Sequence, residues 1–558
     1  MDTELDAIAD AYWQSLLDAD PVGATLIGER DRDEAVPDPS EDGDEDRLEH
    51  LRDLLGRTRQ IEDAGLDPHD RVTLACLAFS IEALIEELTS RLVEFDVSPT
   101  WGEVRHLLDF TQKVTLDTPE QAQALVARYR AVPSWFDHLA ERHRAGVARD
   151  RTPTRRAVEQ ALDQLDAVLG LAVDESPFLA PETPATWSDA EASAWRDQLA
   201  AGVTEAVLPA LQRYREVLAR EVAPHARPSE RCGLVWLPDG EEVYASAVRR
   251  HTTTALSARE IHDIGLEAVA ALRDEYRELA AGVLGTADLD AIFDRLRNDE
   301  ALRFTTSEEV FAHAERALRR AEESVPGWFG RLPSTPCEVR EMAPYEVEHT
   351  TIAYYGPPAG DGSRPGRYYV NTWAPETRTR FESEALAFHE AVPGHHTQIA
   401  IAQELTDVPD FRRFARVTAF QEGWALYTER LSDEMGLYSG DLERLGMLSF
   451  DSWRACRLVV DTGMHALGWS RQRAVDYLRE NSPQAENNIE NEVDRYIGRG
   501  GQALAYKIGQ REIRRLRDET EQRLGEHFDI REFHDVVLGN GAVPLNIMHE
   551  IVARSLGS

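Results

Sequence analysis

Most of this 558-residue sequence repeats its hydrophobic residues at helical spacing, and this periodicity limits the fold more than any other feature. In the first segment, Leu5, Ile8, Tyr12 and Leu16 fall on one side of a helix with 3.6 residues per turn. Segments with the same period are 72–95, 119–147, 153–170, 187–222 and most of the chain after 380. We therefore expect a mostly α-helical fold.

Strand signals are confined to three short segments rich in Val, Thr and Tyr. They are 337–342, 350–355 and 367–372, and the Pro- and Gly-rich segment 357–366 has the composition of a turn. All three precede the densest cluster of histidines and acids in the sequence. We expect a small β-sheet next to the helix that carries this cluster.

Two helix starts have the pattern of a capping box, in which a Ser or Thr is followed three residues later by Glu. They are Ser257 with Glu260, and Thr306 with Glu309. The strongly acidic segment 31–47 is expected to be a solvated connection between helices.

A stretch rich in Pro and Gly, 223–250, divides the sequence into two unequal parts. We predict an N-terminal helical part, 1–225, and a C-terminal catalytic part, 226–558.

The charge balance excludes several classes of partner. The sequence has 101 Asp and Glu against 61 Lys and Arg, a formal net charge of −40. Binding a nucleic acid or an anionic membrane needs a cationic surface, so neither partner is expected.

The sequence also lacks the features of export and of membrane insertion. The start, MDTELDAIADAYWQ, has no basic flank and apolar run of a signal peptide, and no apolar run approaches the ~18 residues of a membrane span. Its four widely separated cysteines fit neither a disulfide framework nor a thiolate zinc site. These observations predict a soluble, cytoplasmic protein.

One short segment has the residues of a metal site. His389 followed directly by Glu390 is how zinc hydrolases place a ligand beside a general base. The usual second ligand stands four residues on, but Pro393 occupies that position and the next histidines are His395 and His396. On an ideal helix the i+7 position lies about 10 Å along the axis, too far for two rings to share an ion at ~2 Å. We therefore expect the Pro-Gly step to break the helix and bring one histidine of the pair back.

A third ligand is expected from a carboxylate on a following helix, as in zinc sites with two histidines. The segment 420–431, FQEGWALYTERL, places two acids in an apolar helical run. Glu422 is the predicted ligand, and Glu429 is the second candidate.

Four motifs, HEAVPGHH (389–396), EGWALYTERL (422–431), DGSRPGRYYVNT (361–372) and GQALAYKIG (501–509), resemble those of the DUF885 family. This family is a bacterial group of predicted zinc metallopeptidases of the gluzincin type, and weaker similarity extends over most of the chain. The resemblance implies a mostly helical fold with a long substrate cleft, and peptidase-like chemistry.

We predict a single zinc ion (Zn²⁺) held by His389, by Glu422 and by either His395 or His396. Glu390 is the predicted general base, which takes a proton from the attacking water and passes it to the leaving amine. The oxyanion that forms on the substrate needs another hydrogen-bond donor.

The candidates for that donor are Tyr496, Tyr506, His465 and the histidine of the pair that does not bind metal.

Lysine is rare in this sequence, where only Lys113 and Lys507 occur. Lys507 stands beside Tyr506 in a family motif, where a compact ammonium would suit a substrate carboxylate. Arg364 and Arg495 are alternatives for the same role. If one of these residues binds the C-terminal carboxylate of a substrate, the enzyme would be a carboxypeptidase or a dipeptidase.

The prediction is therefore a zinc metallopeptidase that cleaves amide bonds of short peptides. One alternative is a metal-dependent amidohydrolase acting on a non-peptide or modified amide. Another is a helical binding protein with a structural metal, although structural zinc sites usually have four protein ligands.

Overall fold

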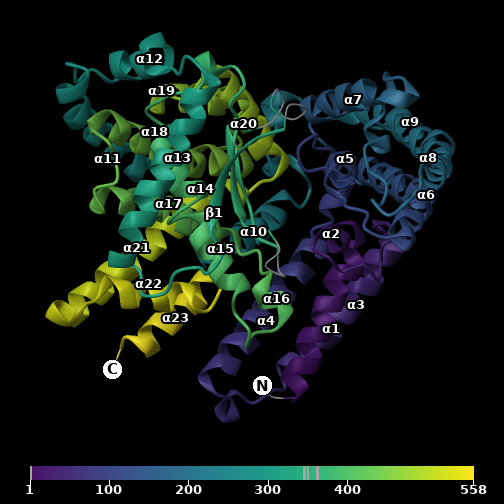
Figure 1. The fold of residues 1–558 in the computed structure, drawn as a ribbon, viewed down its shortest axis with the longest axis horizontal. Coiled ribbons are helices and arrows are strands. Elements are labelled where there is room, and N and C mark those ends of the chain that lie inside the picture. The colour runs from purple at the N-terminus through teal and green to yellow at the C-terminus, as the bar shows by residue number, and fades with distance from the viewer. Residues whose placement is uncertain (1–2, 344–346, 348–350, 360–363, 558) are drawn as a thin grey trace.

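The computed structural model describes residues 3–343, 347, 351–359 and 364–557. Its described residues are mostly helical, with one small sheet near the middle of the molecule (Figure 1). The predicted fold class is confirmed, because the apolar positions with helical period are the buried ones. On α1 (Thr3–Ala19), for example, Leu5, Ile8 and Tyr12 face the core.

The N-terminal helices contribute to two different hydrophobic cores. Helices α1, α3 and α4 pack into the core that also contains the helices of the candidate site. Helices α5 to α9 enclose a core of their own around Trp135, Phe136 and Trp195, on the right of Figure 1. The division near residue 225 stays a prediction. The helices after α1 in this part are α2 (Pro21–Leu26), α3 (Glu41–Thr58), α4 (Pro68–Thr89), α5 (Glu103–Lys113), α6 (Pro119–Ala148), α7 (Arg155–Leu169), α8 (Asp189–Gly202) and α9 (Leu208–Val217).

The C-terminal helices surround the site in long antiparallel or crossing pairs. The most extensive contacts join α11 to α18, and α17 to α21. These helices are α10 (Gly240–Thr252), α11 (Ala258–Val283), α12 (Leu289–Asn298), α13 (Ser307–Ser324), α14 (Ser383–Glu390), α15 (His395–Gln403), α16 (Asp410–Arg413), α17 (Thr418–Glu434), α18 (Asp441–His465), α19 (Arg471–Asn481), α20 (Glu486–Gly498), α21 (Ala505–Leu524), α22 (Ile530–Leu538) and α23 (Leu545–Ser555).

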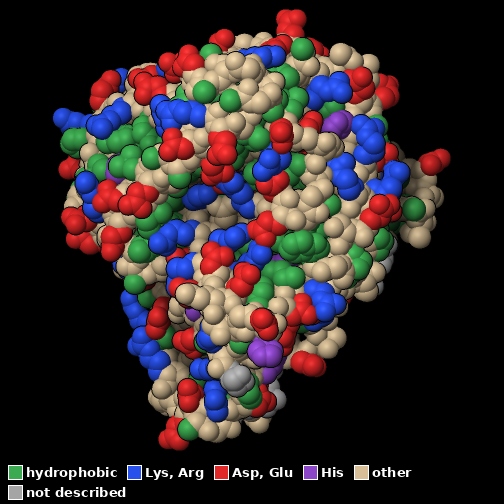
Figure 2. Space-filling view, turned by 90° about the vertical axis from the view of Figure 1, so that its left-hand side faces the viewer, with side chains coloured by type: hydrophobic (Ala, Val, Ile, Leu, Met, Phe, Trp, Pro, Cys, Tyr) green, Lys and Arg blue, Asp and Glu red, His purple; other side chains and the backbone are tan. Residues whose placement is uncertain are grey.

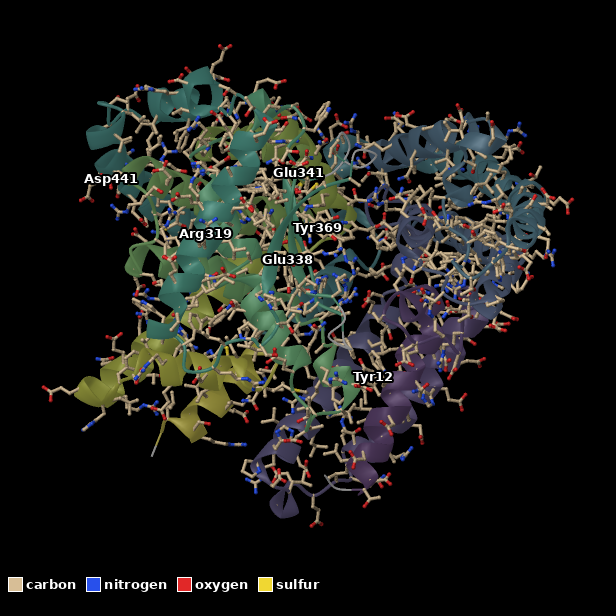
Figure 3. All side chains as sticks on the ribbon, in the orientation of Figure 1. Tyr12, Arg319, Glu338, Glu341, Tyr369 and Asp441 are labelled. Atoms are coloured by element: carbon tan, nitrogen blue, oxygen red, sulfur yellow. The ribbon has the colours of Figure 1, made fainter. Side chains whose placement is uncertain are left out.

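The predicted small sheet is present and lies where expected. Its strands β1 (Cys337–Glu341), β2 (Ala353–Gly356) and β3 (Gly366–Val370) are ordered β1-β3-β2. Strand β3 runs parallel to β1 and antiparallel to β2. Tyr354 and Tyr369 are cross-strand partners whose rings stack with centroids 4.8 Å apart; Figure 3 labels Tyr369 on the sheet. The sheet contacts α13, α14 and α15, so it is adjacent to the helix that carries His389.

The acidic segment 31–47 is only partly a connection, which corrects the sequence prediction. Helix α3 begins at Glu41, and the Ser40 side chain caps it by accepting a hydrogen bond from the Gly43 amide. Acids in a first helical turn interact favourably with the helix dipole, so a run of Asp and Glu is compatible with a helix start.

Of the two predicted capping boxes, the one formed by Ser257 and Glu260 is complete. At the other, Thr306 accepts from the Glu309 amide, whereas the Glu309 carboxylate accepts from the Thr305 amide.

Within the described part of the chain, no helix is long and apolar enough to cross a membrane. The face shown in Figure 2 mixes acidic and basic side chains, and a hollow near its centre has Lys and Arg side chains along its edge.

Candidate metal site

The helix that carries His389 breaks directly after the His-Glu pair, as the Pro-Gly step predicts. Helix α14 ends at Glu390 and α15 begins at His395, with four turn residues between them. The His396 amide donates to the Ala391 carbonyl at 3.1 Å, and the Trp424 indole donates to the Pro393 carbonyl at 3.0 Å. These bonds fold the chain back so that α15 starts beside the end of α14.

This turn requires glycine at position 394. A Cβ added there would lie 1.9 Å from the His389 carbonyl oxygen and 2.4 Å from that of Phe388. No side chain fits between the turn and the last carbonyls of α14, so Gly394 permits the close approach that places His395 near His389.

We predict that Gly394→Ala lowers the affinity for zinc by at least about tenfold, because the displaced turn moves one ligand relative to another. Competition with a chromophoric chelator measures this affinity. Gly282→Ala is the matched control, since a Cβ at that helical glycine meets no atom within 4 Å. Unchanged zinc affinity in Gly394→Ala would contradict this account of the turn.

Three side chains converge across the break. The Nε2 atoms of His389 and His395 lie 3.6 and 3.5 Å from Oε2 of Glu422, and the three potential ligand atoms lie within 4.8 Å of one another. Two imidazoles and a carboxylate are the donors of a catalytic zinc site that leaves a fourth position for water, and bonds of ~2 Å are compatible with these separations. The residues present therefore fit a single zinc ion.

Close packing of two helices sets the position of Glu422. Gly423, its neighbour on α17, faces Gly509 on α21, where a Cβ on Gly423 would lie 2.4 Å from the Gly509 Cα. The two glycines let the helices approach. Glu422 on α17 thereby acts electrostatically on Tyr506 of α21: burial, followed by the charge of Glu422, raises the pKa of Tyr506.

Glu429 orients His389 from the side opposite to the other ligands. Its Oε1 lies 2.8 Å from Nδ1 of His389, and both side chains are buried. A hydrogen bond at Nδ1 leaves Nε2 for a metal, as in the carboxylate–histidine–zinc arrangement. Glu429, the second candidate ligand from the sequence, therefore contacts the ligand His389 and is not itself part of the ligand group.

Without a metal, the two carboxylates favour a protonated His389. Burial by itself would lower the pKa of this histidine, but its bonds with Glu422 and Glu429 outweigh burial and raise the pKa to about 9. A proton and a metal ion therefore compete for the same imidazole.

We predict that Glu429→Gln weakens zinc binding by about 10- to 100-fold, the usual effect of losing the outer partner of a ligating histidine. The same chelator titration measures it. Glu434→Gln is the control on the same helix, because Glu434 pairs with Arg514 and Arg517 and does not contact His389. Equal zinc affinities of the two variants would show that Glu429 does not support the site.

Glu390 is the last residue of α14, directly after His389, and it interacts electrostatically with all three ligands. Burial raises the pKa of its carboxyl group, the charges of His389 and His395 lower it, and that of Glu422 raises it. A carboxylate in this position is suited to exchange a proton with a water close to the ligands.

His396 points away from this group, and strand β2 and the segment before β1 bind its two ring nitrogens. Nδ1 lies 2.8 Å from the Tyr355 hydroxyl, and Nε2 lies 3.0 Å from the Thr335 carbonyl. Burial lowers the pKa of His396 to about 4, so the ring is neutral. Of the two histidines that the sequence left as alternatives, the structure brings His395 to the ligand group.

Among the predicted oxyanion donors, Tyr506 interacts electrostatically with the ligand Glu422. The Tyr496 hydroxyl is fully engaged: it donates to Glu492 at 2.6 Å and accepts from Arg457 at 2.8 Å and from Trp453 at 2.9 Å. The structure does not bring Tyr496 to the ligand group.

His465 is also elsewhere. Its Nδ1 accepts from the Leu234 amide at 3.1 Å, and its Nε2 lies 3.0 Å from the Tyr496 carbonyl. Burial lowers its pKa to about 4. The neutral ring therefore joins backbone segments and does not contact the ligands.

Two of the three basic residues proposed to bind a substrate carboxylate, Lys507 and Arg495, already pair with acids. Lys507 donates to the buried Asp451 and, at 2.7 Å, to Gln510. Arg495 forms two bonds with Glu492, at 3.0 and 2.8 Å. Arg364 lies at the edge of its loop, where its guanidinium is 3.5 Å from the Pro365 carbonyl; residues 361–363 of the loop lie outside the described residues.

Sequence reasoning did not single out Arg454 and Arg457, which occupy neighbouring positions on α18 and are 5% and 3% exposed. The available signal was their i, i+3 spacing within an otherwise apolar helical run, RACRLVVDTGM, because buried arginines need a partner or a function.

The structure has a cavity of about 970 Å³, and the long substrate cleft that the resemblance implies stays a prediction. It is lined by N-terminal residues such as Trp101 and by C-terminal residues that include Arg495 and Gly500. Arg495 also donates to Gln502 at 2.9 Å, at the start of the segment that carries Tyr506. The three ligands are not among the lining residues of this cavity.

The fold and the site together define a class: a large helical protein with a His-His-Glu ligand group at a broken helix beside a small sheet. The sequence profile of the family described as "Bacterial protein of unknown function (DUF885)" matches residues 21–552. The chain belongs to this family. No curated protein matches it.

Two solved structures share the fold. One is "the putative lipoprotein from Colwellia psychrerythraea", with 26% identity, full coverage of both chains and a TM-score of 0.92. The other is "a putative lipoprotein of unknown function from Shewanella oneidensis", with 19% identity, 98% coverage of each chain and a TM-score of 0.76. A carboxypeptidase of Pyrococcus furiosus aligns over 100% of this chain and 96% of its own at 9% identity, but its TM-score of 0.39 is too low to support an argument.

The predicted cytoplasmic location is contradicted by the descriptions of these two similar proteins as lipoproteins. The prediction relied on the lack of a signal-peptide pattern, of an apolar membrane span and of a disulfide framework in the sequence. A lipid anchor needs no such span, because acyl chains supply the apolar area that enters the membrane.

Proposed function

We propose that this protein is a zinc-dependent hydrolase that cleaves the amide bonds of short peptides. The convergence of His389, His395 and Glu422, with Glu390 beside them, carries the proposal. Two histidines and one carboxylate leave a coordination position for water, which distinguishes catalytic zinc sites from structural ones.

A zinc ion at this site would polarise the scissile carbonyl and lower the pKa of a bound water. The protein's own residues perform the remaining tasks. Glu390 accepts the proton of the attacking water and delivers it to the leaving amine. Glu429 holds His389 in the orientation that presents Nε2. Tyr506, which interacts electrostatically with Glu422, is the candidate to donate a hydrogen bond to the developing oxyanion.

Metal analysis combined with substrate profiling tests the proposal. Purified protein is expected to contain one zinc per chain, and mass spectrometry is expected to detect cleavage within a library of peptides of two to about ten residues. Cleavage restricted to acylated amines or other non-peptide amides would indicate an amidohydrolase instead. A zinc-saturated protein that unfolds on chelation and cleaves none of these amides would contradict the proposal and indicate a structural metal.

A further inference from the structure

Arg454 is a buried cation on a helix that packs against the site. Helix α18 contacts α14, α17 and α21, which carry His389, Glu422 and Tyr506. The guanidinium of Arg454 lies 4.5 Å from the ring centroids of both Phe450 and Trp453. The side chain thus packs against both aromatic rings and is only 5% exposed.

Arg454 also lacks a matching anion. Its Nε is buried without a hydrogen-bond partner, and its Nη1 contact with the Phe450 carbonyl, at 3.5 Å, is at the limit for a hydrogen bond. Among the residues that the structure describes, no carboxylate forms an ion pair with it. By contrast, the other cations in this region have acids: Arg430 and Lys507 pair with Asp451, and Arg457 and Arg495 pair with Glu492.

Burying an unpaired guanidinium costs free energy unless a bound ligand supplies the missing anion. Helix α18, which carries Arg454, packs against α14, the helix that ends with His389 and Glu390. Trp453, against which Arg454 stacks, also contacts Arg457, whose guanidinium lies 4.3 Å from the centroid of the Tyr506 ring. A series of stacked side chains therefore connects Arg454 to Tyr506, the candidate oxyanion donor.

We propose that Arg454 binds the C-terminal carboxylate of the substrate, so that the enzyme removes residues from the C-terminus of short peptides or splits dipeptides. The inference rests on the proposed function. A planar guanidinium offers two parallel N–H donors to a carboxylate, and a site poor in other free cations makes this pairing selective. Water adds across the last amide C–N bond of the substrate. This step releases the C-terminal residue as a free amino acid and leaves a new carboxylate on the remaining peptide.

Matched substrates test the inference: one short peptide with a free C-terminal carboxylate, and the same peptide with a C-terminal amide. Wild-type enzyme is expected to prefer the free acid by at least about 100-fold in kcat/KM, the size typical for a buried charge pair. Arg454→Ala is expected to lose this preference, because kcat/KM falls for the free-acid peptide and stays the same for the amide. Arg454→Lys is expected to keep part of the preference. Arg473→Ala is the control, because Arg473 also stacks on an aromatic ring, 3.9 Å from the centroid of Trp469, but is exposed on α19.

The outcomes separate the two proposals. Equal cleavage of acid and amide by wild-type enzyme overturns the role of Arg454 and leaves the proposed hydrolase intact. An equal loss on both substrates in Arg454→Ala, with zinc content and circular dichroism unchanged, also overturns it. If zinc-loaded wild type cleaves neither peptide, the proposed function fails, and calorimetry with a free amino acid and its amide decides Arg454: equal binding overturns the inference. If Arg454→Ala does not fold, the acid-to-amide ratio of Arg454→Lys decides, and an unchanged ratio overturns it.

Discussion

Glu390→Gln should lower kcat for peptide hydrolysis by about 10³-fold, within the usual range for losing a general base, while zinc still binds. Glutamine keeps the size of the side chain but has no carboxylate to accept a proton. Glu390 adjoins the ligand His389 and interacts electrostatically with His395 and Glu422, which suits it to this role. Steady-state kinetics with a cleaved peptide, together with metal analysis of the same sample, measures both effects.

Glu376→Gln is the matched control for this experiment, since Glu376 is exposed in the segment before α14. Its activity should equal that of the wild type. Activity of Glu390→Gln within a few-fold of the wild type, with one zinc bound, would remove Glu390 from the mechanism.

The second large effect separates the two adjacent histidines. His395→Ala should lower zinc affinity by more than the roughly 10- to 100-fold expected for an outer partner, because it removes one of three ligands. His396→Ala should keep the zinc but lose about 1–3 kcal/mol of stability, since the partly buried Tyr355 hydroxyl and Thr335 carbonyl would lose their partner. Chelator competition and urea denaturation measure the two quantities.

The reverse result, with zinc lost from His396→Ala and retained by His395→Ala, would contradict the ligand assignment. Equal losses would indicate that the turn, and not one side chain, holds the metal.

Local patterns in the sequence were sufficient for much of the fold. Helical period, capping residues and the Pro-Gly step depend on neighbours a few residues apart, and the structure has the helices, the sheet and the break after Glu390 where these patterns predict them. The prediction of a connection over 31–47 was wrong from Glu41 onward, because charge density alone does not distinguish a loop from the first turns of a helix. Ser40, which caps α3, was the better signal.

The choice between His395 and His396 could not be made from spacing, because it depends on a sheet that is distant in the sequence. Tyr355 and Thr335 bind His396 and thereby exclude it from the ligand group. The geometry of the turn also determines which histidine reaches the ligand group. Hydrophobic periodicity does not indicate the close approach of Gly394 to the His389 carbonyl on which this turn depends.

The basic residues illustrate the same limit. The rarity of lysine drew attention to Lys507, yet its partner Asp451 lies 56 positions away and occupies the ammonium. A residue's availability for substrate depends on such long-range pairing. Arg454 is of interest for the opposite reason, because no described acid pairs with it.

X-ray diffraction from crystals of zinc-loaded protein, with data above and below the zinc absorption edge, tests the central claim most directly. The account predicts one anomalous peak per chain, about 2 Å from the Nε2 atoms of His389 and His395 and from a carboxylate oxygen of Glu422. A peak coordinated by His396 or Glu429, or no peak in a sample that hydrolyses peptides, would contradict it.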